Sequence, residues 1–407
     1  TRFHTLAKYF PEYGWEPTVL TIKRPGKLPE GIRLIETDYK DILNEKKIKV
    51  GFNPNETVHE RLGIKVSKNF NYPTCKSKII KLIRQAVAFP DEQKGWYYFA
   101  LKSASKFLDN EKVDAIISTS YPVTSHLIAR KLKQKYKIPW IADLRDLWTQ
   151  NTYVNKVGLI KFFERRLELK TLSDADALVT VTEPWIDTLK VLHKNKEIYC
   201  VTNGFDEDDF QKLPSKLTNK FTITYTGILY NGKRDPTLLF KVVEQLISGK
   251  KINRDLIEIR FYGPKEEWLL NDIKKYNLEG VVNCYGNLPR DDVLKRQRES
   301  QILLLLLWNN KSEEGFCPAK VYEYFGARRP IIAIGGSEHI VKSILETTNA
   351  GKYVWNSDML TNVLLEYYEE FIKIGELKCR SNNNIEKYTY NSITKRYSEI
   401  LNGLVLK

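Results

Sequence analysis

Three stretches of the sequence carry residue types that could bind a charged, hydroxyl-rich ligand. The first is EEGFCPAKVYEYFGARRP, residues 313–330, which lies between two apolar runs typical of buried parallel strands. Pro318 suits a helix start, and a helix that follows a parallel strand directs its N-terminus at the ligand crevice of an α/β sheet. There Lys320 could meet a diphosphate, and Glu323 could accept hydrogen bonds from a ribose diol. An amphipathic surface helix with ordinary charges is the alternative interpretation.

The second stretch is YTGILYNGKRDP, residues 225–236, in which two glycines follow a strand and precede Lys233 and Arg234. Glycines let a backbone approach a ligand closely, and paired cations can neutralise the charge on a leaving diphosphate. A strand-to-helix turn whose charges face solvent would show the same pattern.

The third stretch is IPWIADLRDLW, residues 138–148, which places Asp143, Arg145 and Asp146 around the carboxyl end of a strand. Open α/β sheets bind ligands at that edge, so these carboxylates could hold or activate an acceptor hydroxyl. An internal ion pair is the competing interpretation. The preceding strand ends in STSYP, which adds Ser120 and Tyr121 at the same edge.

Short strands alternating with helical patterns must position these residues, and that alternation predicts parallel sheets built from βαβ units. The sequence gives two complete sets of alternating elements and therefore predicts two doubly wound domains. The polar stretch from Asn203 to Lys220 marks the boundary. The expected strands are Thr18–Ile22, Arg33–Glu36, Asp114–Ser118, Trp140–Asp143, Ala177–Thr182, Glu197–Thr202, Thr222–Gly227, Glu258–Tyr262, Val282–Tyr285, Ile302–Leu307, Pro330–Ile334 and Lys352–Trp355.

Composition narrows the class of protein. The 407 residues suffice for two or three domains, and no apolar run approaches the length of a membrane span. Five scattered cysteines without a CxxC pair indicate a reduced, cytoplasmic protein without a structural metal site. The net charge of +15 lies mostly in the first half and could attract nucleic acid, an anionic membrane or phosphorylated ligands. No nucleic-acid-binding module is recognisable, so nucleic acid is not an expected partner.

Two irregular regions carry further expectations. The chain opens directly in a helical pattern, whereas a Rossmann-type domain begins with a central strand and a Gly-rich turn, so we expect both to precede residue 1 in the natural protein. Residues 50–75 show no clear period and are expected to form a long loop. The next segment, KSKIIKLIRQAVAF at residues 76–89, has one apolar and one cationic face, as do helices that lie on anionic membranes. The alternative is a core helix whose lysines extend their charged ends to solvent.

Read in order, nine matches over most of the chain, one of them a pair of stretches, resemble the family 4 retaining glycosyltransferases of the GT-B fold. In the first half they are the opening helix RFHTLAKYFPEYGWEPTVLT, FPDEQKGW, the pair STSYP and WIADLRDLW, and DADALVTVTEP. In the second half they are VTNGFDEDDF, YTGILYNGKRDP, RFYGPKEE, YGNLPRDDV and PAKVYEYFGARRPIIAIG.

The resemblance implies an α/β GT-B fold of two Rossmann-like, doubly wound domains that face a central cleft. Residues 1–203 would bind the acceptor and residues 204–385 the nucleotide-sugar donor, while a helix at 386–407 would return toward the first domain. The implied catalytic residues are Lys233, Arg234 and Glu314. The implied donor-binding residues are Gly227, Tyr262, Gly263, Asn287, Leu288, Gly315, Phe316, Cys317, Lys320 and Glu323. Acceptor-side contacts are expected from Ser120, Tyr121, Asp143, Arg145 and Asp146.

The implied activity is transfer of a hexosyl group, with retention, to a saccharide or lipid-linked saccharide in surface polysaccharide or glycan biosynthesis. UDP is the expected nucleotide because most members of the family use it, and neither a metal nor another cofactor is expected. The protein would be cytoplasmic, with an anionic inner membrane face as a candidate partner. Two alternatives stay open: a GT-B sugar-nucleotide epimerase, and a non-catalytic protein that binds sugar nucleotides.

Overall fold

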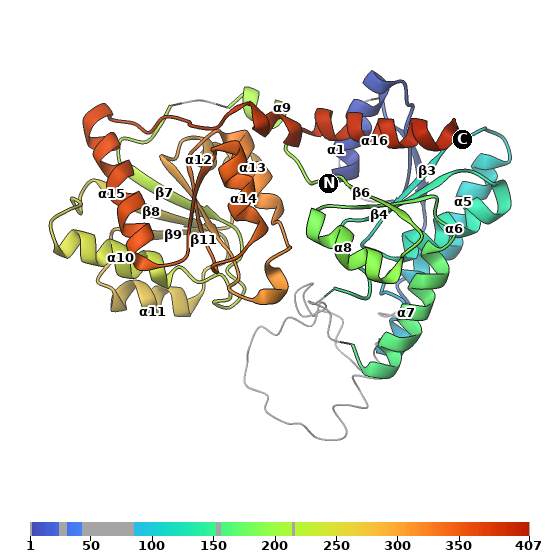
Figure 1. Cartoon of the computed structure of the whole chain (residues 1–407), viewed down its shortest axis with the longest axis horizontal. Helices are drawn as coiled ribbons and strands as arrows, with labels where there is room; N and C mark the ends of the chain where they lie inside the picture. The colour runs from blue at the N-terminus through green and yellow to red at the C-terminus, as the bar shows by residue number, and fades with distance from the viewer. Residues whose placement is uncertain (1, 24–30, 43–84, 152–155, 214–215, 407) are drawn as a thin grey trace. The chain divides into compact units, whose positions relative to one another are not determined.

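The computed structural model describes residues 2–23, 31–42, 85–151, 156–213 and 216–406 (Figure 1). The chain divides into two compact units. The first comprises Thr1–Thr202 together with Thr394–Lys407, and the second comprises Asn203–Ile393. The predicted loop at 50–75 and all but the last residues of the predicted amphipathic segment at 76–89 lie outside the described residues.

The strands of the first unit form two separate parallel sheets. One sheet pairs β1 (Thr18–Ile22) with β2 (Arg33–Thr37), and the other has the order β3-β4-β5-β6. The four strands of the second sheet are β3 (Ile116–Thr119), β4 (Trp140–Leu144), β5 (Ala177–Thr180) and β6 (Glu197–Cys200). The helical elements are α1 (Arg2–Tyr9), η1 (Phe10–Tyr13), η2 (Lys94–Trp96), α5 (Tyr97–Leu108), α6 (Thr124–Tyr136), α7 (Gly158–Leu172), α8 (Glu183–Leu192) and the last part of α16 (Tyr390–Val405).

Strand β4 shows why the second of these sheets forms. All five of its residues, WIADL, are buried, as expected of a central parallel strand covered on both faces. Trp140 packs in one cluster with Leu172 of α7 and Leu189 of α8. An aspartate within this apolar run, Asp143, needs hydrogen-bond or ion-pair partners because its carboxylate is buried.

The second unit contains one six-stranded parallel sheet of order β12-β11-β10-β7-β8-β9. Its strands are β7 (Phe221–Thr226), β8 (Ile257–Tyr262), β9 (Val282–Gly286), β10 (Ile302–Leu306), β11 (Ile331–Ile334) and β12 (Gly351–Val354). Its helical elements are α9 (Asp208–Gln211), α10 (Thr237–Ser248), α11 (Glu267–Lys275), α12 (Arg290–Arg298), η3 (Lys311–Glu313), α13 (Ala319–Ala327), α14 (Ile340–Thr348), α15 (Ser357–Ile374), η4 (Asn383–Tyr388) and the start of α16.

Helices cover both faces of this sheet (Figure 1). The leucine run of β10 alternates between the two: Ile302, Leu304 and Leu306 join the cluster with α10, α11 and α15, whereas Leu303 and Leu305 join the cluster with α13 and α14. An uninterrupted apolar run is therefore what this buried strand requires.

The strand order fixes where a ligand crevice lies. From β7 the chain proceeds outward through β8 to the edge strand β9, then returns to β10 on the other side of β7 and proceeds through β11 to β12. Doubly wound sheets bind ligands at the carboxyl ends of the strands where the order reverses, here β7 and β10. The loops that follow these two strands are the second and first stretches singled out in the sequence.

All twelve strands expected from the sequence are present, with ends that differ by at most two residues. Among the described residues, no helix combines the length and the apolar character needed to cross a bilayer.

Candidate functional site

Glycines at the ends of three neighbouring strands bring the backbone of the second unit close together. Gly227, Gly263 and Gly286 end or follow β7, β8 and β9, and all three have positive φ. The Gly227 N–H donates to the carbonyl of Tyr262 at 2.7 Å, and the Gly263 N–H donates to the carbonyl of Gly286 at 3.0 Å. A Cβ on Gly263 would lie 2.2 Å from the Gly227 carbonyl oxygen, so only glycine fits this position.

Two predicted cations lie on aromatic rings in the loop after β7. The Lys233 ammonium is 4.2 Å from the ring centroid of Trp308, which follows β10. The Arg234 guanidinium is 4.8 Å from the ring centroid of Tyr230, and the Tyr230 and Trp308 rings contact edge to face at 6.2 Å. The loops after β7 and β10 therefore meet through this pair of rings, and both cations lie at that junction.

A third cation reaches the same junction from α13. The Lys320 ammonium is buried and lies 4.1 Å from the ring centroid of Tyr225 in β7. A Cβ on Gly227 would approach this nitrogen to 2.4 Å, so the glycine leaves room for the lysine as well as for the backbone. Burial lowers the pKa of Lys320 well below its usual value, and the nearby Arg234 lowers it further.

Glu323, one helical turn beyond Lys320, belongs to a polar network. Gln297 of α12 donates through Nε2 to a carboxylate oxygen of Glu323 and, at 3.0 Å, to the Thr226 hydroxyl at the end of β7. The other Glu323 oxygen lies 3.5 Å from the guanidinium of Arg290, which also pairs with Asp209 at 2.5 Å. The carboxylate is therefore held in place while remaining partly exposed to solvent.

Two stacked tyrosines mark the carboxyl ends of β8 and β9. The rings of Tyr262 and Tyr285 are 5.0 Å apart and inclined by 17°. The Tyr285 hydroxyl donates to Glu258 at 2.6 Å, and burial together with this carboxylate raises the pKa of Tyr285 to about 12. Asn287 and Leu288 follow β9, the first exposed and the second half-buried. This edge offers the flat aromatic surface that a nucleobase would use.

The loop between β10 and α13 contains the residues expected to contact the transferred group. Gly315 and Phe316 are half-buried, and Cys317 is buried, which raises the pKa of its thiol to about 12. The Glu314 carbonyl accepts a hydrogen bond from the Ile340 N–H at 2.8 Å, which ties this loop to the start of α14. Glu314 itself is half-buried.

On the first unit, Asp143 makes internal contacts. Its carboxylate is completely buried and accepts hydrogen bonds from the hydroxyls of Thr119 and Tyr397, both at 2.8 Å. The Arg2 guanidinium lies 3.9 Å from it. The ion-pair interpretation of this residue therefore describes the structure, with Arg2 as the partner in place of Arg145.

The other predicted acceptor-side residues cluster at the ends of β3 and β4. The Ser120 hydroxyl donates to the Asp146 carbonyl at 2.9 Å, and Arg145 pairs with the Asp146 carboxylate at 3.2 Å. The Tyr121 hydroxyl is buried and has no hydrogen-bond partner within the described parts of the chain. Burial, followed by the nearby Glu164, raises its pKa.

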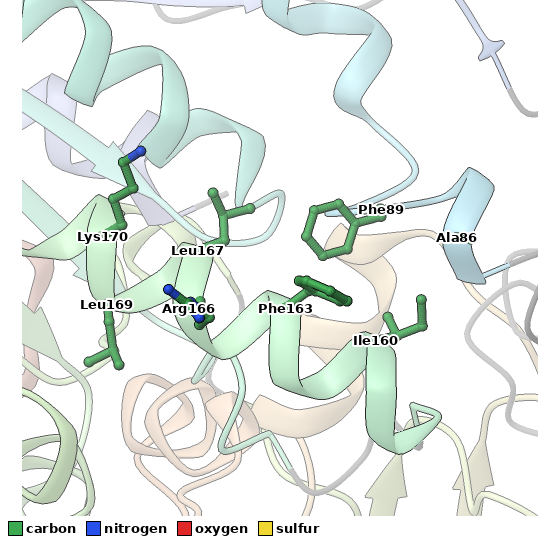
Figure 2. Close-up of a pocket in the computed structure, with 8 residues that line it drawn as sticks. All are labelled: Ala86, Phe89, Ile160, Phe163, Arg166, Leu167, Leu169 and Lys170. Atoms are coloured by element: carbon green, nitrogen blue, oxygen red, sulfur yellow. The ribbon is translucent and has the colours of Figure 1, made fainter.

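A pocket of about 760 Å³ lies along α7 of the first unit, lined by Ala86, Phe89, Ile160, Phe163, Arg166, Leu167, Leu169 and Lys170 (Figure 2). Helix α7 buries acidic side chains and exposes aromatic ones, which is the opposite of the usual arrangement. Its buried side carries Glu164 and Glu168, while Phe162 and Phe163 are 54% and 53% exposed. Trp148 donates to Glu164 at 3.0 Å, which helps to satisfy that buried carboxylate.

Sequence reasoning missed four residues of the second-unit site. Gln297 and Arg290 lie in RDDVLKRQR, and this run is so polar that the sequence does not show which of its side chains face inward. Arg290 did offer a usable signal, because it stands at the start of a helix directly after a turn. Trp308 follows a buried strand at the crevice edge, and Tyr285 is an aromatic at a strand end. In the described residues no cluster of three or more His, Cys, Asp or Glu could hold a metal ion.

Residues 1–209, just over half of the chain, match the family model described as Glycosyltransferase Family 4. No curated protein matches the sequence.

Among solved structures, the chain is similar to the sucrose-phosphate synthase of Thermosynechococcus elongatus, with 13% identity, a TM-score of 0.58, and coverage of 98% of this chain and 92% of that one. It is also similar to Anabaena Alr3699/HepE in complex with UDP and glucose, with 13% identity, a TM-score of 0.56, and coverage of 95% and 100%. The lipopolysaccharide outer core galactosyltransferase WaaB matches with 11% identity, a TM-score of 0.52, and coverage of 98% and 94%. At these identities the likeness shows a shared fold.

Proposed function

This chain belongs to glycosyltransferase family 4 and has the two Rossmann-like domains of the GT-B fold, and from that premise we propose a specific reaction. The enzyme would transfer a hexosyl group, with retention, from a UDP-sugar to a hydroxyl of a saccharide or lipid-linked saccharide acceptor. Surface polysaccharide or glycan biosynthesis is the process that we propose it serves.

One observation carries the donor assignment: three kinds of group suited to a nucleotide lie along one edge of the sheet, from β10 and β7, where the strand order reverses, to β8 and β9. Glu323 offers a fixed carboxylate for a ribose diol, and Lys233, Arg234 and Lys320 offer positive charge for a diphosphate. The Tyr262–Tyr285 stack offers a surface for the base. A nucleoside diphosphate requires all three.

The proposed reaction needs no nucleophile from the protein. The bond from the sugar's anomeric carbon to the β-phosphate oxygen breaks as the acceptor oxygen bonds to the same face. The acceptor's proton passes to the departing phosphate. The protein's contribution is then to position both substrates and to stabilise the charge that develops on the diphosphate. Because side chains supply that positive charge, we propose that transfer proceeds without a metal and that EDTA leaves the rate unchanged.

The donor proposal is tested by the thermal stability of the protein in UDP, GDP, ADP and TDP. Its support is the site geometry together with a fold shared with HepE, whose structure contains UDP and glucose. A ligand at 100 times its dissociation constant adds about 2.7 kcal/mol of stability. We expect UDP to stabilise the wild type but not Glu323→Ala, while the exposed Glu346→Ala responds as the wild type does. If no nucleotide stabilises the folded protein, the proposed donor site is wrong.

Product analysis distinguishes transfer from the two alternative activities. With UDP-sugar and acceptor, the expected product is a glycoside of unchanged anomeric configuration. An epimerised sugar nucleotide formed without acceptor would instead identify an epimerase. Binding of UDP without turnover for any acceptor would favour a non-catalytic protein.

For the acceptor, we propose a lipid-linked saccharide presented at the inner face of an anionic membrane, with α7 as the docking helix. Leu159, Phe162 and Phe163 are all more than half exposed, and the exposed cations Lys161 and Arg165 lie between and beside them. Apolar side chains flanked by cations match a surface of acyl chains beneath anionic headgroups. The shared fold with WaaB, a lipopolysaccharide galactosyltransferase, agrees with such an acceptor.

Sedimentation with vesicles tests this docking. We expect the protein to pellet with phosphatidylglycerol-containing vesicles more than with pure phosphatidylcholine, and Phe162→Ser or Lys161→Glu to reduce that binding. Val191→Ser is the matched control, because Val191 is an exposed apolar residue on another helix of the same unit. Binding that ignores lipid charge, or that Val191→Ser reduces equally, would remove the membrane proposal.

A further inference from the structure

Lys320 has an environment unlike that of the other two cations at the crevice. Its side-chain nitrogen is shielded from solvent and has no hydrogen-bond partner among the described residues, although an ammonium has three N–H groups to satisfy. It lies 4.1 Å from the centroid of the Tyr225 ring, and it occupies the space beside Gly227 in which a Cβ would come within 2.4 Å of it. A buried, unpartnered ammonium is costly, and a lysine in such a place can shed its proton.

The charged groups around Lys320 do not supply a neutralising partner. Arg234, from the loop after β7, opposes the charge, whereas Glu323, from the same helix, favours it more weakly. Glu323 itself is engaged by Gln297 and Arg290. Tyr225, whose ring lies beneath the ammonium, is a further titratable neighbour, and burial raises its pKa, so that it stays neutral. The free site therefore favours the neutral amine.

We propose that Lys320 is uncharged in the free enzyme and takes up one proton from solvent when the donor's diphosphate binds at the Gly227 loop. This inference rests on the proposed function and adds to it the uptake of one proton when the donor binds. The diphosphate supplies the anionic oxygens that the ammonium lacks, and the flexible four-carbon stem of the lysine allows the nitrogen to turn toward them.

Proton uptake gives the donor site two properties. The positive charge is present only when an anion occupies the site, so the free enzyme avoids an uncompensated buried charge. By linkage, donor affinity must fall as pH rises through the range between the free and bound pKa values of this amine. The dissociation constant for UDP would rise by up to tenfold per pH unit there.

Calorimetric titration of the whole protein with UDP at pH 8.5 in buffers of different ionisation enthalpy measures the protons taken up. At this pH UDP is fully ionised and contributes none. We expect the wild type to take up close to one proton per UDP, and Lys320→Arg, whose charge is permanent, to bind UDP with uptake near zero. Lys352→Met, which removes an exposed lysine on β12, should behave as the wild type does.

The outcomes separate this inference from the function on which it rests. UDP binding by the wild type without proton uptake would overturn the inference and leave the donor site intact. Uptake that persists in a folded Lys320→Arg would also overturn it, by assigning the proton to another group. Failure of the folded wild type to bind UDP, GDP, ADP or TDP would refute the proposed function itself, and this inference with it.

Discussion

At the scale of single residues, Gln297 shows how a buried neutral side chain can set the ligand affinity of a partly exposed carboxylate, that of Glu323. It is fully buried, and its amide orients the Glu323 carboxylate against the end of β7. We expect Gln297→Met, which keeps the side-chain length, to weaken UDP binding roughly 10- to 100-fold, because a hydrogen bond to a charged group contributes about 1.5–3 kcal/mol. Calorimetric titration with UDP measures this.

The same titration with 2′,3′-dideoxy-UDP shows whether Gln297 acts through Glu323. This ligand lacks the diol that Glu323 is proposed to bind, so wild type and Gln297→Met should bind it with similar affinity. Equal losses for both nucleotides would mean that the substitution disturbs the site as a whole, and the positioning role would be rejected.

Substitution of Lys233 should lower the catalytic rate much more than it weakens donor binding. Its ammonium lies over Trp308, at the junction of the two crevice loops. If it stabilises the departing diphosphate, Lys233→Ala should lower kcat by about 10²-fold or more while weakening UDP-sugar binding much less. Steady-state rates and donor titrations provide the two quantities, with the exposed Lys241→Ala on α10 as control. A proportional fall in both would assign Lys233 to binding alone.

Sequence spacing predicted Lys320 and Glu323 for this candidate site, but neither Arg290 nor the contacts that orient the Glu323 carboxylate. Glu323 and Lys320 could be predicted because they follow a buried strand at the start of a helix, a position with a known relation to the crevice. Gln297 could not, since the side chain that turns inward from a polar helix is decided by packing against β7 and α13. Asp143 was predicted from local spacing as an acceptor-side residue, but its partners Arg2 and Tyr397 are far from it in the sequence. Local spacing could not predict these contacts.

At the scale of elements, the junction of β7 and β8 depends on a glycine that no other residue can replace. A Cβ on Gly263 would collide with the backbone oxygen of Gly227, and φ is +157°. We expect Gly263→Ala to displace this junction and to lower both stability and UDP affinity, by more than the 1–3 kcal/mol typical of backbone strain alone. Gly280→Ala is the matched control, since φ is +80° there and nothing lies within 4 Å of the new atom.

Chemical denaturation gives the free energy of unfolding of the two glycine variants. Comparing the two values separates the steric clash at Gly263 from the backbone strain that both positions share. If Gly263→Ala is no less stable than Gly280→Ala and retains UDP binding, close approach of the two backbones is not required. The sequence predicted the strands of the described residues, most directly β10 and β11, because a parallel strand buried on both faces has an unbroken apolar run. The pairing of strands in the first unit, where β1 and β2 form a sheet apart from β3–β6, was not predicted, because strand pairing is a long-range property that local patterns do not record.

At the scale of the whole molecule, each unit contains a buried histidine whose neutrality links folding to pH. Burial lowers the pKa of His126, in the first unit, to about 3 and that of His339, in the second, to about 4. An unfolded histidine has a pKa near 6.5, so below that value the unfolded state binds more protons than the folded one. Stability is therefore complete above about pH 6.5 and is lost as the pH falls toward the folded values, by up to about 1.4 kcal/mol per pH unit for each histidine.

Substituting each histidine should flatten this dependence in its own unit. The Nδ1 of His126 lies 2.7 Å from the Ser118 hydroxyl, and a glutamine can replace that hydrogen bond without titrating. Hydrogen exchange of β4 and β10, compared at pH 7 and pH 5 after correction for intrinsic rates, reports the opening free energy of each sheet. His126→Gln should reduce the pH 5 loss in β4 and His339→Gln the loss in β10. If His126→Gln leaves the loss in β4 unchanged, then His126 is not the group that links folding of the first unit to acid.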